Sequence, residues 1–154
     1  MEIVVDTNVF LDALFKTDRH AALVLYNEHK GRCSFVMSDG MREELLRQVS
    51  FHTLKLCKLI SEANRVHRMV SRFMHRTRLL NPVTLVAISP HYPDNEFIAC
   101  AIDAGVSFVV TYNTSHFSST GHEPILNCRG EPIRVVSPWQ FNAEMAGMIA
   151  PKGI

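Results

Sequence analysis

Three acidic residues stand where divalent-metal chemistry could use them: Asp6, Glu44 and Asp94. Each comes soon after a short apolar run and stands within or at the start of a stretch with helical spacing. Carboxylates that converge repel one another unless a cation neutralises them. Sites rich in oxygen ligands suit Mg²⁺ or Mn²⁺. The three positions are therefore candidates for one divalent-metal site.

Each of these residues also has a structural interpretation of its own. Asp6 and Asp94 suit helix caps, because an Asp side chain accepts hydrogen bonds from the first free backbone N–H groups of a helix. Glu44, like its neighbour Glu43, suits a solvated helix face. Their joint occurrence near predicted strand ends favours a common site over three unrelated roles.

The elements that must position these residues alternate along the chain. Short apolar runs predict strands at residues 3–5, 33–37, 83–88, 108–110 and 133–136. Helical spacing and capping residues predict helices after Asp6, at 19–30, from 38–39 to about 49, from about 53 to 79 as one long helix or a helical pair, from Asp94 to 104, and from Pro138. This alternation predicts an α/β fold, with a mainly parallel central sheet of about four to five strands covered by helices on both faces.

The sheet explains how acids far apart in the sequence can meet. In open α/β sheets, ligands gather at the carboxyl ends of the parallel strands. Asp6 follows the first predicted strand, Glu44 lies in the helix after the second, and Asp94 opens the helix after the third. We therefore expect the three side chains at the same edge of the sheet.

Length and composition predict one soluble domain at residues 1–146, followed by a loose tail at 147–154. Apolar residues make up 47% of the chain and the net charge is only +1, which by itself indicates no partner. No apolar run is long enough to span a membrane. The four cysteines are widely spaced without zinc spacing and are expected to be reduced in a cytoplasmic protein: Cys33, Cys57, Cys100 and Cys128.

One local stretch departs from this even charge. Positions 65–78 contain no acid, and arginine recurs there at helical spacing, at Arg65, Arg68, Arg72 and Arg76. One interpretation is contact with the phosphate backbone of a nucleic acid. The other is a solvated helix face whose opposite side packs through apolar residues.

Five segments, in order, resemble the motifs of PIN-domain proteins. Residues 4–11 are similar to the opening of that family, in which an apolar strand leads through Asp-Thr/Ser-Asn into an apolar helix. Residues 38–45 resemble the second motif, and that register makes Glu44 the ligand and Glu43 its solvated neighbour. Residues 94–101, 108–113 and 137–141 resemble the third, fourth and closing motifs, so the resemblance covers nearly the whole chain.

The resemblance implies a ribonuclease that needs Mg²⁺ or Mn²⁺ and leaves 5′-phosphate and 3′-hydroxyl ends. Asp6, Glu44 and Asp94 would hold the metal together with Asn113, while Asn8 and Thr111 would position metal ligands or substrate. Many active PIN nucleases have Asp where Asn113 stands, so this chain lacks the fourth charge and its activity is expected to be weak or absent. The likeness is to the bacterial toxin-antitoxin branch (virulence-associated toxin C-like), which implies an RNA substrate, a cognate antitoxin and a homodimer.

Two other functions remain open from the sequence. The chain could be a catalytically weak PIN-fold protein that binds RNA or a partner without cutting. It could also be a haloacid-type phosphatase-like α/β domain, because such enzymes place an Asp after the first strand. They need a second Asp two residues later, however, where this chain has Asn8, and no Lys stands in register before the later acid. His116 is interpreted as a helix-cap or surface histidine in preference to a substrate contact.

Overall fold

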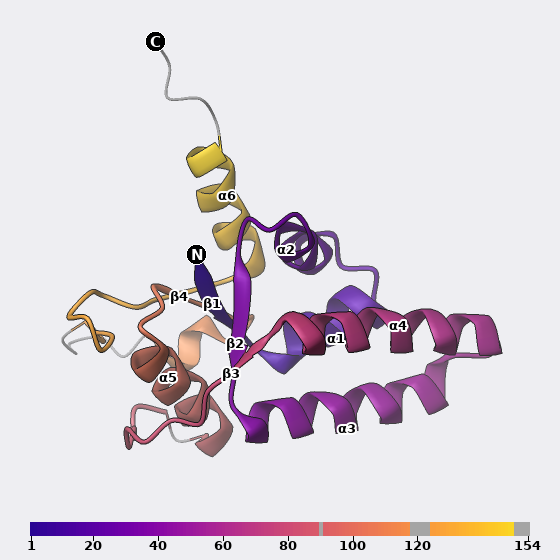
Figure 1. Ribbon diagram of the computed structural model, residues 1–154, viewed down its shortest axis with the longest axis horizontal. Coiled ribbons are helices and arrows are strands. Elements are labelled where there is room, and N and C mark those ends of the chain that lie inside the picture. The colour runs from indigo at the N-terminus through magenta and orange to yellow at the C-terminus, as the bar shows by residue number, and fades with distance from the viewer. Residues whose placement is uncertain (90, 118–123, 150–154) are drawn as a thin grey trace, which may run out of the picture.

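The computed structural model describes residues 1–89, 91–117 and 124–149 (Figure 1). Its centre is a five-stranded sheet in the order β3-β2-β1-β4-β5, and every paired strand is parallel. The strands are β1 (Glu2–Val5), β2 (Ser34–Met37), β3 (Arg78–Leu79), β4 (Phe108–Val110) and β5 (Arg134–Val136). The predicted α/β fold with a mainly parallel sheet is confirmed.

Six α-helices and one 3₁₀ helix accompany these strands in the described part of the chain. They are α1 (Thr7–Phe15), α2 (Arg19–His29), α3 (Asp39–Leu56), α4 (Ile60–Arg76), α5 (Tyr92–Ala104), η1 (Thr114–His116) and α6 (Pro138–Ile149). None of these helices is long and apolar enough to cross a membrane.

The strand register divides the sheet into two buried faces. Phe35 on β2 stands beside Ile3 on β1, and on this face Phe10 of α1 packs edge-on against Phe35 with ring centroids 5.3 Å apart. On the same face Phe141 of α6 packs against Phe108. The opposite face carries α5, which contacts β1, β2 and β4. Helices therefore cover both faces, as Figure 1 shows with α5 on one side of the sheet and α1 on the other.

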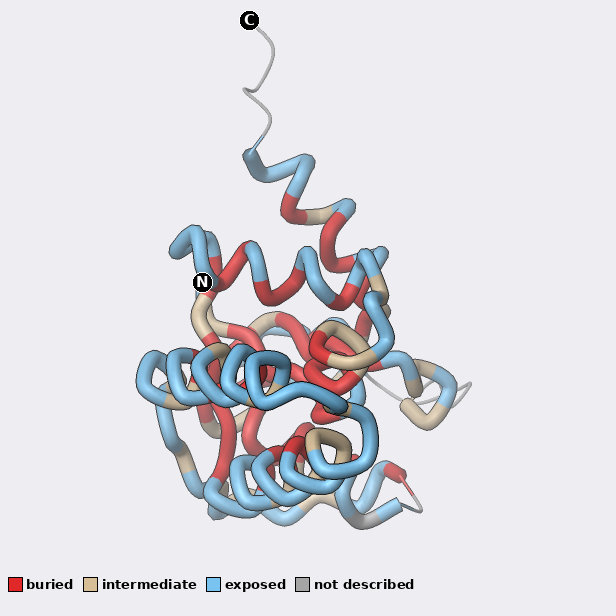
Figure 2. The backbone as a smooth tube through the Cα atoms, turned by 90° about the vertical axis from the view of Figure 1, so that its right-hand side faces the viewer, coloured by how far each residue is buried: buried red, intermediate tan, exposed pale blue. Residues whose placement is uncertain are grey.

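Helices α3 and α4 form a long hairpin beside the sheet (Figure 1). The sequence predicted one helix from 38–39 to about 49 and a long helix or helical pair from about 53 to 79, but α3 continues from Asp39 to Leu56 without the expected break. The second stretch therefore contains the end of α3 and the single helix α4. Glu62 stabilises the turn that joins the helices, because its carboxylate accepts hydrogen bonds from the backbone N–H groups of Lys58 and Leu59. The hairpin buries mainly its inner face, and Figure 2 shows exposed residues along both helices.

The predicted strand at residues 83–88 is wrong. The chain pairs with β2 earlier, through Arg78 and Leu79, and Pro82 then ends the pairing because it has no N–H to donate. Beyond it the segment is a loop in which Leu85 is 98% exposed. The carboxylate of Asp103 accepts the backbone N–H groups of Val83 and Thr84, which satisfies part of this backbone without a neighbouring strand.

Two helix boundaries also bear on the predictions. Helix α5 begins at Tyr92, so Asp94 lies in its first turn instead of opening the helix, and it ends at Gly105 (φ +70°) as expected from a glycine C-cap. Helix α6 continues through Ile149, into the predicted loose tail, and residues 150–154 of that tail lie outside the described residues.

Candidate functional site

A cleft of about 540 Å³ opens at the carboxyl ends of the central strands, between α1, α3 and α5. Strand β1 turns directly into α1 and β2 into α3, while β4 ends beside β1. The cleft is lined by all four predicted metal-site residues: Asp6, Glu44, Asp94 and Asn113. The fold thus brings together residues that are more than a hundred positions apart in the chain.

Asp6 is held on both of its carboxylate oxygens. It follows β1 directly, is only 5% exposed, and caps α1 by accepting the backbone N–H of Asn8 at 3.2 Å. The hydroxyl of buried Thr111 donates to the other oxygen at 2.7 Å. Asn8 and Thr111 therefore both contact Asp6, as expected for residues predicted to position metal ligands. Asn8 makes this contact through its backbone, and the residue as a whole is exposed.

Asp94 is held from two other segments. The hydroxyl of Ser89 donates to its Oδ2 at 2.9 Å, and Nδ1 of His116 lies 2.9 Å from the same oxygen. The ring of His116 in turn stacks on His91, with centroids 4.7 Å apart. The interpretation of His116 as a surface histidine is incomplete, because this half-exposed ring connects η1 to a carboxylate of the cleft.

Asp6 and Asp94 lie within electrostatic reach of each other. Burial raises the pKa of the Asp6 carboxyl above its usual range, and the charge of Asp94 raises it further. The hydrogen bonds from Thr111 and Asn8 and the nearby His116 act in the opposite direction. Two carboxylates in this arrangement stabilise a cation placed beside them.

Glu44 faces the cleft from α3. Its carboxylate accepts a hydrogen bond from the side-chain amide of Gln48 at 3.0 Å and pairs with Arg47. The side chain is 38% exposed, so water reaches it. Glu43, in contrast, is exposed and does not line the cleft, so of these two neighbours only Glu44 reaches it.

Asn113 completes the predicted set at the end of β4. Its backbone N–H donates to the hydroxyl of Thr111 at 3.0 Å, and it stands at the N-cap position of η1 without a side-chain capping hydrogen bond. One hydroxyl therefore connects the turn at Asn113 to the carboxylate of Asp6. These two hydrogen bonds hold the turn at Asn113 close to Asp6.

Several residues of the cleft were not found by sequence reasoning. They are Asp12, Lys16, Arg47, His52 and Glu96. Lys16 pairs with Asp12 at 2.9 Å, so a cation and an anion lie together on the α1 side. Glu96 follows Asp94 by two residues, and because this spacing does not place two side chains on one helix face, nothing in the pattern grouped them.

The four predicted nucleic-acid contacts lie on α4, and none of them lines the cleft. Arg65, Arg68 and Arg72 are exposed. Arg76 instead forms an ion pair at 3.0 Å with Glu28 of α2, whose side chain is buried. Contact of this stretch with nucleic acid stays a prediction, and the cations next to the acids are Lys16 and Arg47.

The donor set fits a divalent cation. Its groups are carboxylate and amide oxygens, which Mg²⁺ and Mn²⁺ prefer. Among the described residues no three Asp, Glu, His or Cys side chains already converge closely enough to hold an ion. Glu44 is bonded to Arg47 and Gln48 in this arrangement, and as a half-exposed side chain it can turn toward Asp6 and Asp94.

Known proteins support the assignment of the fold. The chain is similar to the uncharacterized protein MJ1680 of Methanocaldococcus jannaschii, with 23% identity over 152 residues that cover 97% of this chain and 95% of the relative. It also resembles a chain in the crystal structure of VapBC2 from Rickettsia felis bound to a DNA fragment from their promoter. The TM-score is 0.51 with 14% identity, covering 89% of this chain and 98% of that one, which is a likeness of fold alone.

A model of the PIN domain family matches residues 2–115, a range that includes β1 to β4 and all the residues predicted to form the metal site. The strand order, the cleft at the ends of β1, β2 and β4, and the family match agree. This chain belongs to the PIN domain family.

Proposed function

We propose that this PIN domain hydrolyses RNA phosphodiesters with Mg²⁺ or Mn²⁺, as the toxin component of a toxin-antitoxin pair. The observation that carries the proposal is the common cleft lined by Asp6, Glu44, Asp94 and Asn113. The cleft lies at the carboxyl ends of the adjacent strands β1 and β4, from which the chain connections lead to opposite sides of the sheet. Open α/β sheets bind their ligands at such a point.

The chain's own groups divide the work of such a site. Asp6 and Asp94 present carboxylates that are oriented by hydrogen bonds from Thr111, the backbone N–H of Asn8, Ser89 and His116. Glu44 completes the set from α3. A divalent cation bound by them would lower the pKa of a water molecule and offset the negative charge on phosphorus. Asn113 would orient a water or a phosphate oxygen through its amide.

The cations of the cleft suit a polyanionic substrate. Lys16 and Arg47 line it beside the acids, where they can pair with the phosphates on either side of the scissile bond. The exposed arginines Arg65, Arg68 and Arg72 would contact RNA farther from the reacting phosphate.

An antitoxin and a homodimer belong to the same proposal. They are supported by the motif resemblance to the toxin-antitoxin branch and by the shared fold with a chain of the VapBC2 complex. A small reading frame directly upstream that encodes a DNA-binding protein, and co-purification of its product with this chain, are the expected results. Absence of both would restrict the proposal to the nuclease activity.

A second candidate is a PIN protein that binds RNA without cutting it, which Asn113 favours because its amide supplies no charge. Incubation of labelled RNA with Mn²⁺ and the wild-type protein or Asp6→Asn separates the two functions. Cleavage by the wild type that is lost in Asp6→Asn supports the nuclease, while RNA binding with no cleavage in either protein supports the second candidate.

The haloacid-type phosphatase alternative is no longer proposed, because the family match is to PIN domains and Asn8 stands where a second Asp is required.

A further inference from the structure

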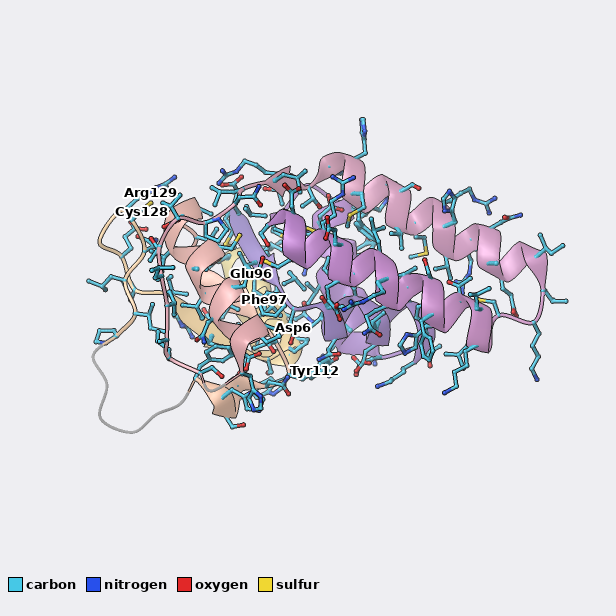
Figure 3. All side chains as sticks on the ribbon, turned by 90° about the horizontal axis from the view of Figure 1, so that it is seen from below. Asp6, Glu96, Phe97, Tyr112, Cys128 and Arg129 are labelled. Carbon is cyan, nitrogen blue, oxygen red and sulfur yellow. The ribbon has the colours of Figure 1, made fainter. Side chains whose placement is uncertain are left out.

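Glu96 lines the same cleft as the predicted metal ligands, although neither the motif resemblance nor its spacing assigned it a role. It projects from the second turn of α5 toward the start of α3, and Figure 3 shows it on the side of α5 that faces Asp6. The hydroxyl of Ser38, the N-cap of α3, donates a hydrogen bond to its Oε1. Glu96 thus connects the two helices that form opposite sides of the cleft.

The close approach of Glu96 to α3 depends on a glycine. A Cβ atom at position 40 would lie 2.5 Å from Oε1 of Glu96, closer than real Cβ contacts come, and 3.1 Å from its Oε2, which is also tight. Gly40 therefore leaves the space in which the carboxylate lies. Any larger residue there would displace it.

This placement brings Glu96 close to Glu44. Gly40 and Glu44 are four residues apart on α3, so they lie on the same helix face, one turn apart. The carboxylate that lies over Gly40 is therefore about one helical turn from the backbone of Glu44, and both acids line the cleft. Asp94, two residues before Glu96 on α5, lines the same cleft.

The charges around Glu96 show what it could contribute. Asp12 is paired with Lys16 and Glu44 with Arg47, whereas no ion pair involves Glu96 in the described part of the chain. With Asn113 at the fourth position of the motif, Asp6, Glu44 and Asp94 provide three negative charges. Adding Glu96 makes four, which matches two divalent cations.

We propose that Glu96 is a further metal-binding residue of this cleft, and that its carboxylate replaces the charge that Asn113 does not supply. This inference rests on the proposed function, because it assumes that the cleft binds divalent cations. The competing interpretation is local: a carboxylate at the N-terminus of α3 stabilises the helix through its hydrogen bond and the helix dipole. The two interpretations differ in whether Glu96 affects metal binding.

The test is calorimetric titration of Mn²⁺ into the wild-type protein, four single variants and one double variant, combined with thermal unfolding without metal. Glu96→Gln keeps an oxygen for the Ser38 hydroxyl but removes the charge. Ser38→Ala removes the hydrogen bond but keeps the charge, Glu43→Gln removes an exposed acid of α3 outside the cleft, and Asp94→Asn removes a proposed ligand.

We expect Glu96→Gln to weaken Mn²⁺ binding by about tenfold or more, or to remove one of two binding events, in the range seen when metal sites lose supporting groups. Ser38→Ala should change the unfolding temperature more than the affinity, and Glu43→Gln should change neither. Introducing Asn113→Asp into the Glu96→Gln variant should restore the lost affinity, because it returns a carboxylate to the cleft.

Unchanged Mn²⁺ affinity and stoichiometry in Glu96→Gln would overturn the inference and leave Glu96 as a cap of α3. If Asp94→Asn weakens binding in the same series, the proposed metal site stands and only the role of Glu96 is lost. If Asp94→Asn also binds Mn²⁺ as the wild type does, the proposed function fails together with the inference.

Discussion

At the scale of single residues, the chemistry of Asp6 depends on groups that come from distant parts of the sequence. Its carboxylate is oriented by Thr111, which is 105 positions away, and its pKa is raised by burial and by Asp94. A buried acid beside another acid destabilises the metal-free protein at neutral pH, since the fold favours its protonated form. The same pair of charges favours a bound cation.

The first prediction separates Glu44 from Glu43. Adjacent residues on a helix point about 100° apart, so both cannot face one ion. Glu44 lines the cleft and Glu43 is exposed. In an RNA cleavage assay with Mn²⁺, we expect Glu44→Gln to abolish detectable cleavage and Glu43→Gln to retain most of it. The reverse result would mean that the motif register is shifted by one residue.

The second prediction concerns Asn113, where the chain departs from the acidic pattern of its family. If charge limits the reaction, Asn113→Asp should tighten Mg²⁺ binding and raise the cleavage rate, most clearly at low Mg²⁺, because two-metal sites gain from stabilising both the attacking and the leaving oxygen. If the amide donates to a phosphate oxygen, the substitution should raise KM without raising kcat. No change in kcat, KM or metal affinity would place Asn113 outside the reacting groups.

What could be predicted at this scale follows from backbone geometry. The positions of Asp6 and Glu44 in the cleft were predictable because strand ends and motif order fix where their backbones lie. Asp94 was placed by motif order alone, because the strand predicted before it at residues 83–88 is a loop. Glu96 was not predictable, because the direction of a long side chain is decided by contacts across the cleft, here the Ser38 hydroxyl and the space left by Gly40. Lys16 and Arg47 were missed for the same reason.

At the scale of elements, sequence patterns predicted buried strands better than edge segments. The apolar runs of β1, β2 and β4 are buried on both faces, so hydrophobicity identified them. The run at residues 83–88 has the same composition, but Pro82 prevents it from continuing the pairing with β2. Strand β3 is exposed and only two residues long, and it gave no apolar signal.

The ion pair between α2 and α4 supplies a prediction on stability. Glu28 is buried and Arg76 is the one cation with which it forms an ion pair in the described part of the chain. We expect Arg76→Ala to lower the free energy of unfolding by about 2 kcal/mol at pH 7, below the usual cost of breaking a fully buried pair because Arg76 is 39% exposed. Arg68→Ala, on the exposed face of α4, is the control and should change it little.

The same variant has a predicted pH dependence. Burial raises the pKa of Glu28 above its usual range, and Arg76 opposes that shift. The folded protein therefore binds the Glu28 proton more tightly than the unfolded chain, and stability falls as pH rises from the unfolded to the folded pKa. Loss of Arg76 raises the folded pKa further, so the defect should shrink when denaturant unfolding is repeated at acidic pH. A defect that is constant with pH would mean that packing, and not charge, links the helices.

At the scale of the whole molecule, the order of the strands determines where function can reside. In the sheet, β2 and β3 lie on one side of β1, and β4 and β5 lie on the other. The loops that follow β1 and β4 therefore lead away from each other at the carboxyl ends of these two strands. Asp6 and Thr111 stand at these two ends and are hydrogen-bonded to each other. The cleft therefore follows from topology, and α3 and α5 supply the remaining acids.

The most direct test of the central claim is analysis of the ends produced when RNA is incubated with this protein and Mn²⁺. We predict fragments with 5′-phosphate and 3′-hydroxyl ends. These fragments should form when Mn²⁺ is available to the protein and should not form after a chelator has removed it. Asp94→Asn should form them at least about a hundredfold more slowly, since even outer partners of a metal site can cost that much. Fragments that carry 2′,3′-cyclic phosphates, or that form equally fast in Asp94→Asn or with the cation chelated, would contradict metal-dependent hydrolysis in this cleft.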